Sequence, residues 1–152
     1  MVDSALLAAK LAVVRDAVER IRSVLPSSLD AFRADRTARE VVALNLFVAI
    51  QECLALASHV LADCAWSVPR TYGESFTVLA DHGVLDSALA ARMRSAAGLR
   101  NLLAHQYGMI DFDRLFELAG ERTQDLTAYC AAVASWIEAQ GRLGTGSNQP
   151  KE

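Results

Sequence analysis

The sequence is poor in the residues that break helices or cross-link loops, with three prolines, eight glycines and three cysteines among 152 residues. Cys53, Cys64 and Cys130 are odd in number and lack paired C-x-x-C spacing, which excludes a disulfide framework and predicts buried thiols. The three histidines show no ligand spacing either, so we expect no metal and no cofactor. No apolar run looks as long as a membrane span, and no signal peptide is evident. We therefore expect a cytoplasmic protein with no membrane partner.

Excess positive charge is also missing. The chain has 15 Lys and Arg against 18 Asp and Glu, a formal net charge of −3. A protein that coats nucleic acid neutralises many phosphates, which this balance excludes. Any contact with RNA must be local, at a place where arginines cluster.

Helical patterning is what the chain does have, together with 53% hydrophobic residues, enough for one domain with a sizeable core. Apolar residues recur at helical spacing and no strand pattern holds. We predict an all-α, up-and-down bundle of about five helices over residues 1–141, with a break near Gly120. Residues 142–152 lack apolar periodicity and predict a disordered tail. The expected helices cover residues 5–25, 36–66, 71–80, 86–108 and 111–140.

The second of these segments, residues 36–66, carries apolar residues on more than one side. Burial on two sides would follow from a dimer face or from a central position in the bundle. His59 lies in this segment, four residues before Asp63, whose carboxylate could orient it. Such a histidine is either a satisfied core or interface residue or a support for an active site.

Most of the recognisable chemistry lies in one run, Gly98–Tyr107. On an α-helix with Arg100 at zero, Ala104 lies near 40°, Asn101 near 100° and His105 near 140°, by about 100° per residue. The leucines of the run lie on the opposite side. Arg100 and His105 are then about 7.5 Å apart along the axis. They would flank a bound group and would not bond to each other.

A phosphodiester suits that arrangement, because a guanidinium holds phosphate oxygens and an imidazole moves a proton near neutral pH. In RNA cleavage His105 would transfer the proton and Arg100 would neutralise charge on the phosphoryl oxygens. Asn101 would position His105 or donate to a phosphate oxygen. One chain supplies a single good proton carrier, so a two-fold homodimer would bring the second.

Two further arginines, Arg92 and Arg94, precede the run by about two turns. With Arg100 they could form a local basic patch that guides an RNA backbone. They could equally belong to a solvated helix face.

The spacing Arg100-x4-His105-x-Tyr107, together with the segment Pro69-Arg-Thr-Tyr-Gly-Glu-Ser-Phe76, resembles the HepT-like toxins of the HEPN ribonucleases. The resemblance implies an all-helical homodimer that cleaves RNA without a metal. It also implies a partner nucleotidyltransferase of the MntA type, which neutralises the toxin by adding AMP to Tyr107. By helical count Tyr107 lies near 340°, beside Arg100. The AMP would then pair with that arginine in place of RNA.

The family's pattern is incomplete in the segment 36–66. A histidine recurs at the position of His59 in such sequences, but the acidic residue expected four positions earlier is Ala55, and Gln51 stands eight positions earlier.

The sequence leaves two functions open. The first is a toxin ribonuclease of a toxin-antitoxin system, favoured by Arg100, His105 and Tyr107. The alternative is a non-catalytic module that binds a nucleotide or a partner and serves as adaptor for a nucleotidyltransferase subunit, favoured by Ala55 and the net negative charge.

Overall fold

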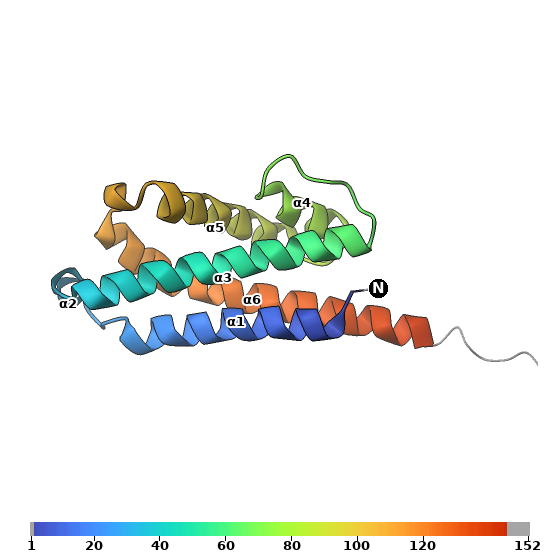
Figure 1. Ribbon diagram of the computed structural model, residues 1–152, viewed down its shortest axis with the longest axis horizontal. Coiled ribbons are helices and arrows are strands. Elements are labelled where there is room, and N and C mark those ends of the chain that lie inside the picture. Colours follow the sequence, from blue (N-terminus) through green and yellow to red (C-terminus); the bar gives the residue numbers. More distant parts are fainter. Residues whose placement is uncertain (1, 146–152) are drawn as a thin grey trace, which may run out of the picture.

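A computed structural model describes residues 2–145 as six α-helices and one short 3₁₀ helix, with no strand in that range. The all-α prediction is confirmed. The helices run in an up-and-down bundle along the long axis of the molecule (Figure 1). They are α1 (Ser4–Val24), α2 (Leu29–Ala34), α3 (Arg36–Asp63), α4 (Glu74–Asp81), α5 (Ser87–His105), η1 (Tyr107–Met109) and α6 (Phe112–Thr145).

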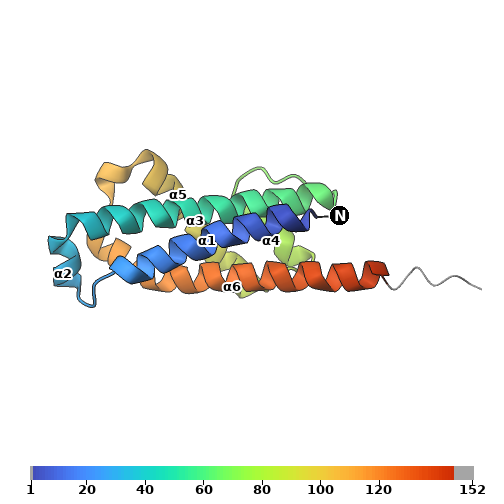
Figure 2. The ribbon, with the colours of Figure 1, turned by 60° about the horizontal axis from the view of Figure 1, so that its bottom comes forward.

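The central element is α3, which packs against each of the other five α-helices. Helices α1 and α6 lie side by side along one flank of α3 (Figures 1 and 2). Helices α4 and α5 cover another flank and pack against each other. This central position explains the apolar residues on two sides of the α3 sequence, because both flanks are covered.

Our expectation that no segment is as long as a membrane span needs correction. By length and composition α3 could cross a membrane, with a mean hydropathy of 1.9 over its most apolar 18 residues. Half of that window is buried inside the bundle. The other helices therefore account for its apolar character, as they do for the core helix of a globular domain.

The helix that carries the candidate site starts where the sequence predicts. The carboxylate of Asp86 accepts the backbone N–H of Leu89 at 2.7 Å, a side-chain N-cap for α5. Its end differs from our prediction. The backbone leaves the α-helix at Gln106 (φ −135°, ψ 36°), and Tyr107 begins the 3₁₀ helix η1. The α-helical angles assigned to Tyr107 therefore do not hold.

Three other boundaries are corrections. Residues 27–35, expected as a connection with at most a turn of helix, contain the six-residue helix α2. We expected the helix at 71–80 to open with Thr71-x-x-Glu74 as a capping box, but α4 begins only at Glu74, whose carboxylate accepts the backbone N–H of Arg70 at 2.8 Å. Helix α6 does not break at Gly120: its neighbour Ala119 is fully buried, and packing outweighs the roughly 1 kcal/mol penalty of a glycine within a helix.

The same helix continues past the expected end of the domain. Residues 142–145 belong to α6, so they are not part of a tail. The rest of the predicted tail, residues 146–152, lies outside the described residues. The prediction of buried thiols is confirmed for Cys53 and Cys130, while Cys64 is half-buried.

A buried hydrogen bond ties α6 to the centre of the bundle. The hydroxyl of Tyr129, a residue with no exposed surface, donates to the backbone carbonyl of Cys53 at 2.9 Å. We expect Tyr129→Phe to lower the free energy of unfolding by about 1 kcal/mol, because the net contribution of such a bond is of that size. Urea denaturation measures the change. Tyr72→Phe is the control, since the exposed Tyr72 hydroxyl makes no bond within residues 2–145. Equal stability of the two variants would contradict the prediction.

Candidate active site

Arg100 is held by three side chains that come from two other parts of the chain. Its guanidinium carbon lies 5.4 Å from the ring centre of Phe47 on α3 and 5.3 Å from that of Tyr72, in the loop before α4. Its Nε donates to the side-chain oxygen of Gln51 on α3 at 2.8 Å. Two cation–π contacts and a hydrogen bond fix the direction of the side chain, which is half-buried. The cation is therefore preorganised before any ligand arrives.

The acceptors around Arg100 are neutral. Besides Gln51, its Nη1 donates to the Oδ1 of Asn101 at 3.0 Å, and no carboxylate of residues 2–145 pairs with it. A guanidinium has five N–H donors, so three remain for an anion. Because neither amide carries charge, the full positive charge stays available for a phosphate or carboxylate.

Asn101 has a different partner from the one we expected. The sequence suggested that it would position His105, one helical turn away, but its oxygen accepts from Arg100 instead. Asn101 is exposed on α5, and its amide N–H groups point to no acceptor within the described chain. It could still donate to a bound oxygen.

His105 is the last residue of α5 and is exposed to solvent. No hydrogen bond holds its imidazole within residues 2–145, so both ring nitrogens are accessible to a ligand. Ala104 is exposed between His105 and Arg100, and its small side chain leaves the helix surface between them open. The structure thus keeps the predicted pair: a fixed cation and, about 7.5 Å further along the axis, an imidazole able to exchange protons.

Tyr107 is 42% exposed and belongs to η1, so the α-helical count that predicted its place beside Arg100 does not apply to it. It lines a groove of about 520 Å³ whose walls do not include Arg100. The pKa of Arg36, at the start of α3, is raised, first by its hydrogen bond to Glu40 and to a smaller extent by Tyr107. Arg36 is therefore a cation close enough to interact with the Tyr107 hydroxyl. The groove is lined by Glu40, Ala43, Leu44, Phe47, Leu103, Ala104 and Tyr107.

Arg92 and Arg94 bond to partners other than those of Arg100. Arg92 pairs with Asp125 of α6 at 2.8 Å, and Arg94 donates to the hydroxyl of Thr77 of α4 at 2.9 Å. Arg100 packs against α3 and the loop before α4, so each of the three arginines contacts a different helix. Arg92 therefore faces α6, whereas Arg94 packs against Gly73, the neighbour of Tyr72 in the loop that also holds Arg100.

His59 is exposed on α3 and makes no bond with Asp63, which had been expected to orient it. It lies eight residues, or about 12 Å along the axis, from Gln51, which bonds Arg100. The structure therefore does not bring His59 to Arg100 within one chain.

The part of the site that the sequence did not predict is the clamp around Arg100, formed by Phe47, Gln51 and Tyr72. Phe47 was counted among core positions, Tyr72 only as part of a family-like segment, and Gln51 only as a departure from the family. One signal was available, because Phe47 and Gln51 are four residues apart and so share a face of α3. Nothing in the sequence placed Tyr72 opposite them.

Residues 14–133 match the Ribonuclease HepT-like family. The chain belongs to that family. The match spans α5 whole, and with it Arg100, Asn101, His105 and the following Tyr107.

Two curated relatives are also similar to this HepT-like chain over most of their length. The mRNA nuclease HepT of Shewanella oneidensis is 24% identical over 124 residues, which cover 82% of this chain and 92% of that protein. The tRNA nuclease HepT of Aphanizomenon flos-aquae is 21% identical over 136 residues, which cover 90% and 92%.

Solved structures share the HepT-like fold. A toxin-antitoxin structure with AMP-PNP superimposes with a TM-score of 0.81 at 22% identity, covering 87% of this chain and 99% of that one. The tri-AMPylated HEPN toxin of Shewanella oneidensis, in complex with an MNT antitoxin, gives 0.78 at 23% identity, covering 86% and 97%. The cytosolic protein YutE of Bacillus subtilis gives 0.80 at 15% identity, covering 91% and 93%.

Proposed function

We propose that this chain is the toxin of a toxin-antitoxin pair and acts as a metal-independent endoribonuclease. The observation that supports it most is the held, uncompensated charge of Arg100 next to the exposed, unpaired imidazole of His105. A phosphodiester needs both, an anion site and a proton carrier. The names of the two curated relatives, an mRNA nuclease and a tRNA nuclease, support the same reaction class.

In the proposed reaction the ribose 2′-oxygen attacks the adjacent phosphorus and the 5′-oxygen leaves. Arg100 binds the non-bridging oxygens, whose charge increases in the transition state. His105 transfers a proton to or from the ribose oxygens. Asn101 holds the guanidinium and donates an amide N–H to the phosphate.

The functional unit we propose is a homodimer. One chain offers a single imidazole beside Arg100, whereas in-line cleavage works best with an acid and a base, so the second would come from the other copy. Large apolar side chains are exposed close to the site, with Leu44 62% and Met109 78% exposed. Such a patch is a candidate for burial in a protein interface.

The partner we propose is an MntA-type nucleotidyltransferase that adds AMP to Tyr107. The phenol is exposed, lines an open groove and lies near Arg36, which could pair with the phosphate of the added group. The tri-AMPylated HEPN toxin complexed with an MNT antitoxin, which has the same fold, supports this regulation.

The geometry supports only indirect roles for Arg92, Arg94 and His59. Arg92 and Arg94 are already bonded, so we assign them only long-range attraction of RNA from partly exposed positions. His59 is assigned a supporting role that would need the second copy. We place the reaction in the cytoplasm.

A non-catalytic adaptor for a nucleotidyltransferase subunit is the second candidate. The observation in its favour is Ala55, which stands where the family's pattern has an acidic residue, since an acid there could have oriented the catalytic groups. Toxicity separates the two. Expression of the wild-type chain alone should arrest growth and expression of His105→Ala should not. An adaptor would make both equally harmless.

The direct test is cleavage of purified single-stranded RNA with and without EDTA. We expect fragments with 2′,3′-cyclic or 3′-phosphate ends, formed at the same rate after chelation. DNA of the same sequence is the control, because it lacks the attacking 2′-hydroxyl. Cleavage of the DNA, or loss of RNA cleavage with EDTA, would contradict the proposed mechanism.

The neutral partner of Arg100 gives a further prediction. Gln51→Glu would place a carboxylate on the guanidinium at about the present 2.8 Å, forming an ion pair that competes with phosphate. We expect kcat/KM on RNA to fall about tenfold, mostly through KM, which corresponds to about 1.4 kcal/mol. Gln124→Glu, exposed on α6, makes the same change in net charge and should leave the rate unchanged. Equal effects of both variants would mean that only overall charge matters.

A further inference from the structure

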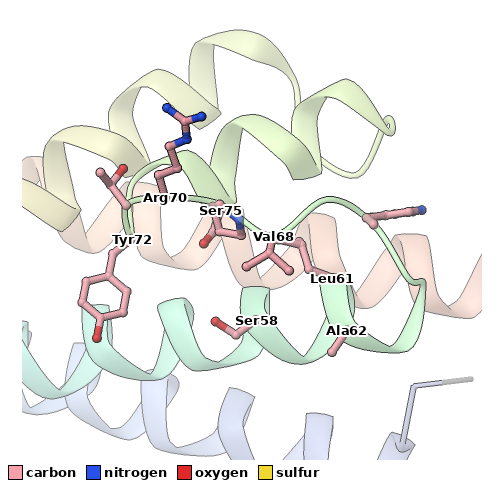
Figure 3. Close-up of a pocket in the computed structure, with 10 residues that line it drawn as sticks. Ser58, Leu61, Ala62, Val68, Arg70, Tyr72 and Ser75 are labelled. Atoms are coloured by element: carbon pink, nitrogen blue, oxygen red, sulfur yellow. The ribbon is translucent and has the colours of Figure 1, made fainter.

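A second cavity lies between α3 and the loop that leads to α4. It has a volume of about 600 Å³ and opens beside Tyr72 (Figure 3). In Figure 3, Val68 and Ser75 lie across the cavity from Ser58 and Ala62 of α3, while the Arg70 side chain points away from that helix. None of the roles assigned to the chain so far uses this space. It is lined by Ser58, Leu61, Ala62, Trp66, Val68, Pro69, Arg70, Thr71, Tyr72 and Ser75.

The walls of this cavity combine flat apolar surfaces with hydroxyl groups. Tyr72 and Trp66 are aromatic, and Trp66 is held in place by stacking on His82, with ring centres 3.9 Å apart. Ser58 and Thr71 add hydroxyl groups at the exposed side. Aromatic faces together with a few polar groups are what a planar heterocycle with polar edges requires.

Ser75 points to a ligand for this cavity. It is only 2% exposed, yet its hydroxyl makes no hydrogen bond within residues 2–145. The hydroxyl oxygen is not sealed from solvent, because it faces the open space of the cavity, where water or a ligand can satisfy it. The hydroxyl of Ser75 is therefore a donor and acceptor available inside the cavity.

The cavity also adjoins the anion site. Tyr72 belongs to its wall and at the same time lies 5.3 Å from the guanidinium carbon of Arg100. The Tyr72 side chain thus lies between the phosphate site at Arg100 and a cavity suited to a flat heterocycle. A nucleotide has both parts, joined by a sugar.

We propose that this cavity is a nucleobase subsite, which takes the base of a nucleotide whose phosphate binds Arg100. The proposal rests on the proposed ribonuclease function and adds to it a source of sequence preference. The base stacks against Tyr72 and hydrogen-bonds to Ser75. Single-stranded RNA suits the site, because its bases are free to turn outward, whereas paired bases are not.

Mononucleotides test the subsite without any need for cleavage. Calorimetric titration compares the four nucleoside 5′-monophosphates with ribose 5-phosphate, which carries the phosphate but no base. We expect at least one nucleotide to bind about tenfold more tightly than ribose 5-phosphate, the scale of stacking one base on an aromatic ring. Equal binding of all five compounds would overturn the proposal.

Two variants locate the binding. Ala62→Phe fills the cavity from an exposed position on α3 and should abolish the advantage of the nucleotides while ribose 5-phosphate still binds. Ala12→Phe, at an exposed position of α1, is the matched control and should keep that advantage, and melting temperatures check that both variants fold. Ser75→Ala should weaken binding of the preferred nucleotide about threefold. If Ala62→Phe preserves the advantage, the cavity is not the base site.

RNA cleavage separates this proposal from the one it rests on. If the wild type cleaves RNA, Ala62→Phe should change which nucleotide adjoins the cut, whereas Ala12→Phe should not. An unchanged pattern of cuts would overturn the subsite and leave the ribonuclease intact. A wild type that binds mononucleotides through the cavity but cleaves no RNA would overturn the ribonuclease and support the subsite.

Discussion

Replacing His105 by alanine should lower the rate of RNA cleavage by about 100- to 10,000-fold, the range that a general acid or base contributes. The imidazole is exposed and unbonded within residues 2–145, so its removal should leave the fold intact. The measurement is single-turnover cleavage of a labelled RNA. Binding of the same RNA should persist, because Arg100 and its three anchors remain.

Gln106→Ala is the matched control for this variant. It changes the next residue along the chain, which is also exposed, and should retain the wild-type rate. A His105→Ala protein that cleaves as fast as Gln106→Ala would remove the imidazole from the mechanism. A His105→Ala protein that no longer binds RNA would instead make His105 a binding residue.

Addition of AMP to Tyr107 should lower cleavage by about a hundredfold or more, the scale of losing one electrostatic contact in the transition state. Tyr107 and Phe47 line one groove, and Phe47 also packs on Arg100, so a bulky anionic group there would crowd and repel an approaching RNA. Intact mass spectrometry after incubation with ATP and the partner nucleotidyltransferase reports the modification. Cleavage of the same sample reports its effect.

Tyr107→Phe separates the modification from the side chain. The variant keeps the ring but lacks the acceptor oxygen, so it should cleave RNA at the wild-type rate and resist neutralisation. Tyr72→Phe should still be modified and neutralised, which would show that Tyr107 is the acceptor among the exposed tyrosines of the described chain. A gain of AMP by Tyr107→Phe would move the acceptor to another residue.

The sequence predicts the helices well wherever helical periodicity and local capping decide the structure. The start of α5 at Asp86 is one example, since a carboxylate three residues before Leu89 is enough to begin the helix. The all-α bundle follows from the same patterning. Arg100, Ala104 and His105 also keep their expected relation, because all three lie on one uninterrupted stretch of α-helix.

Features that depend on contacts between distant segments were not predicted. In the clamp, Arg100 bonds to Gln51, which lies 49 positions away in the sequence. No rule about neighbouring residues connects the two. Tyr107 was misplaced for a different reason. A helical count assumes that the helix continues, but the turn at Gln106 redirects the chain toward the start of α3. Gly120 shows the opposite case, in which burial of a neighbouring residue overrides a weak helix former.

The contacts of α3 with every other α-helix have a consequence for the order in which the molecule opens. No neighbour can be lost without exposing part of α3, so its amides should exchange with deuterium only in global unfolding. The loop before α4 has no regular secondary structure, so it should open at lower free energy than the helices, and it carries Tyr72, one wall of the arginine clamp. Local opening of the loop would then uncover one side of the guanidinium, while Phe47 and Gln51 on α3 still hold the other.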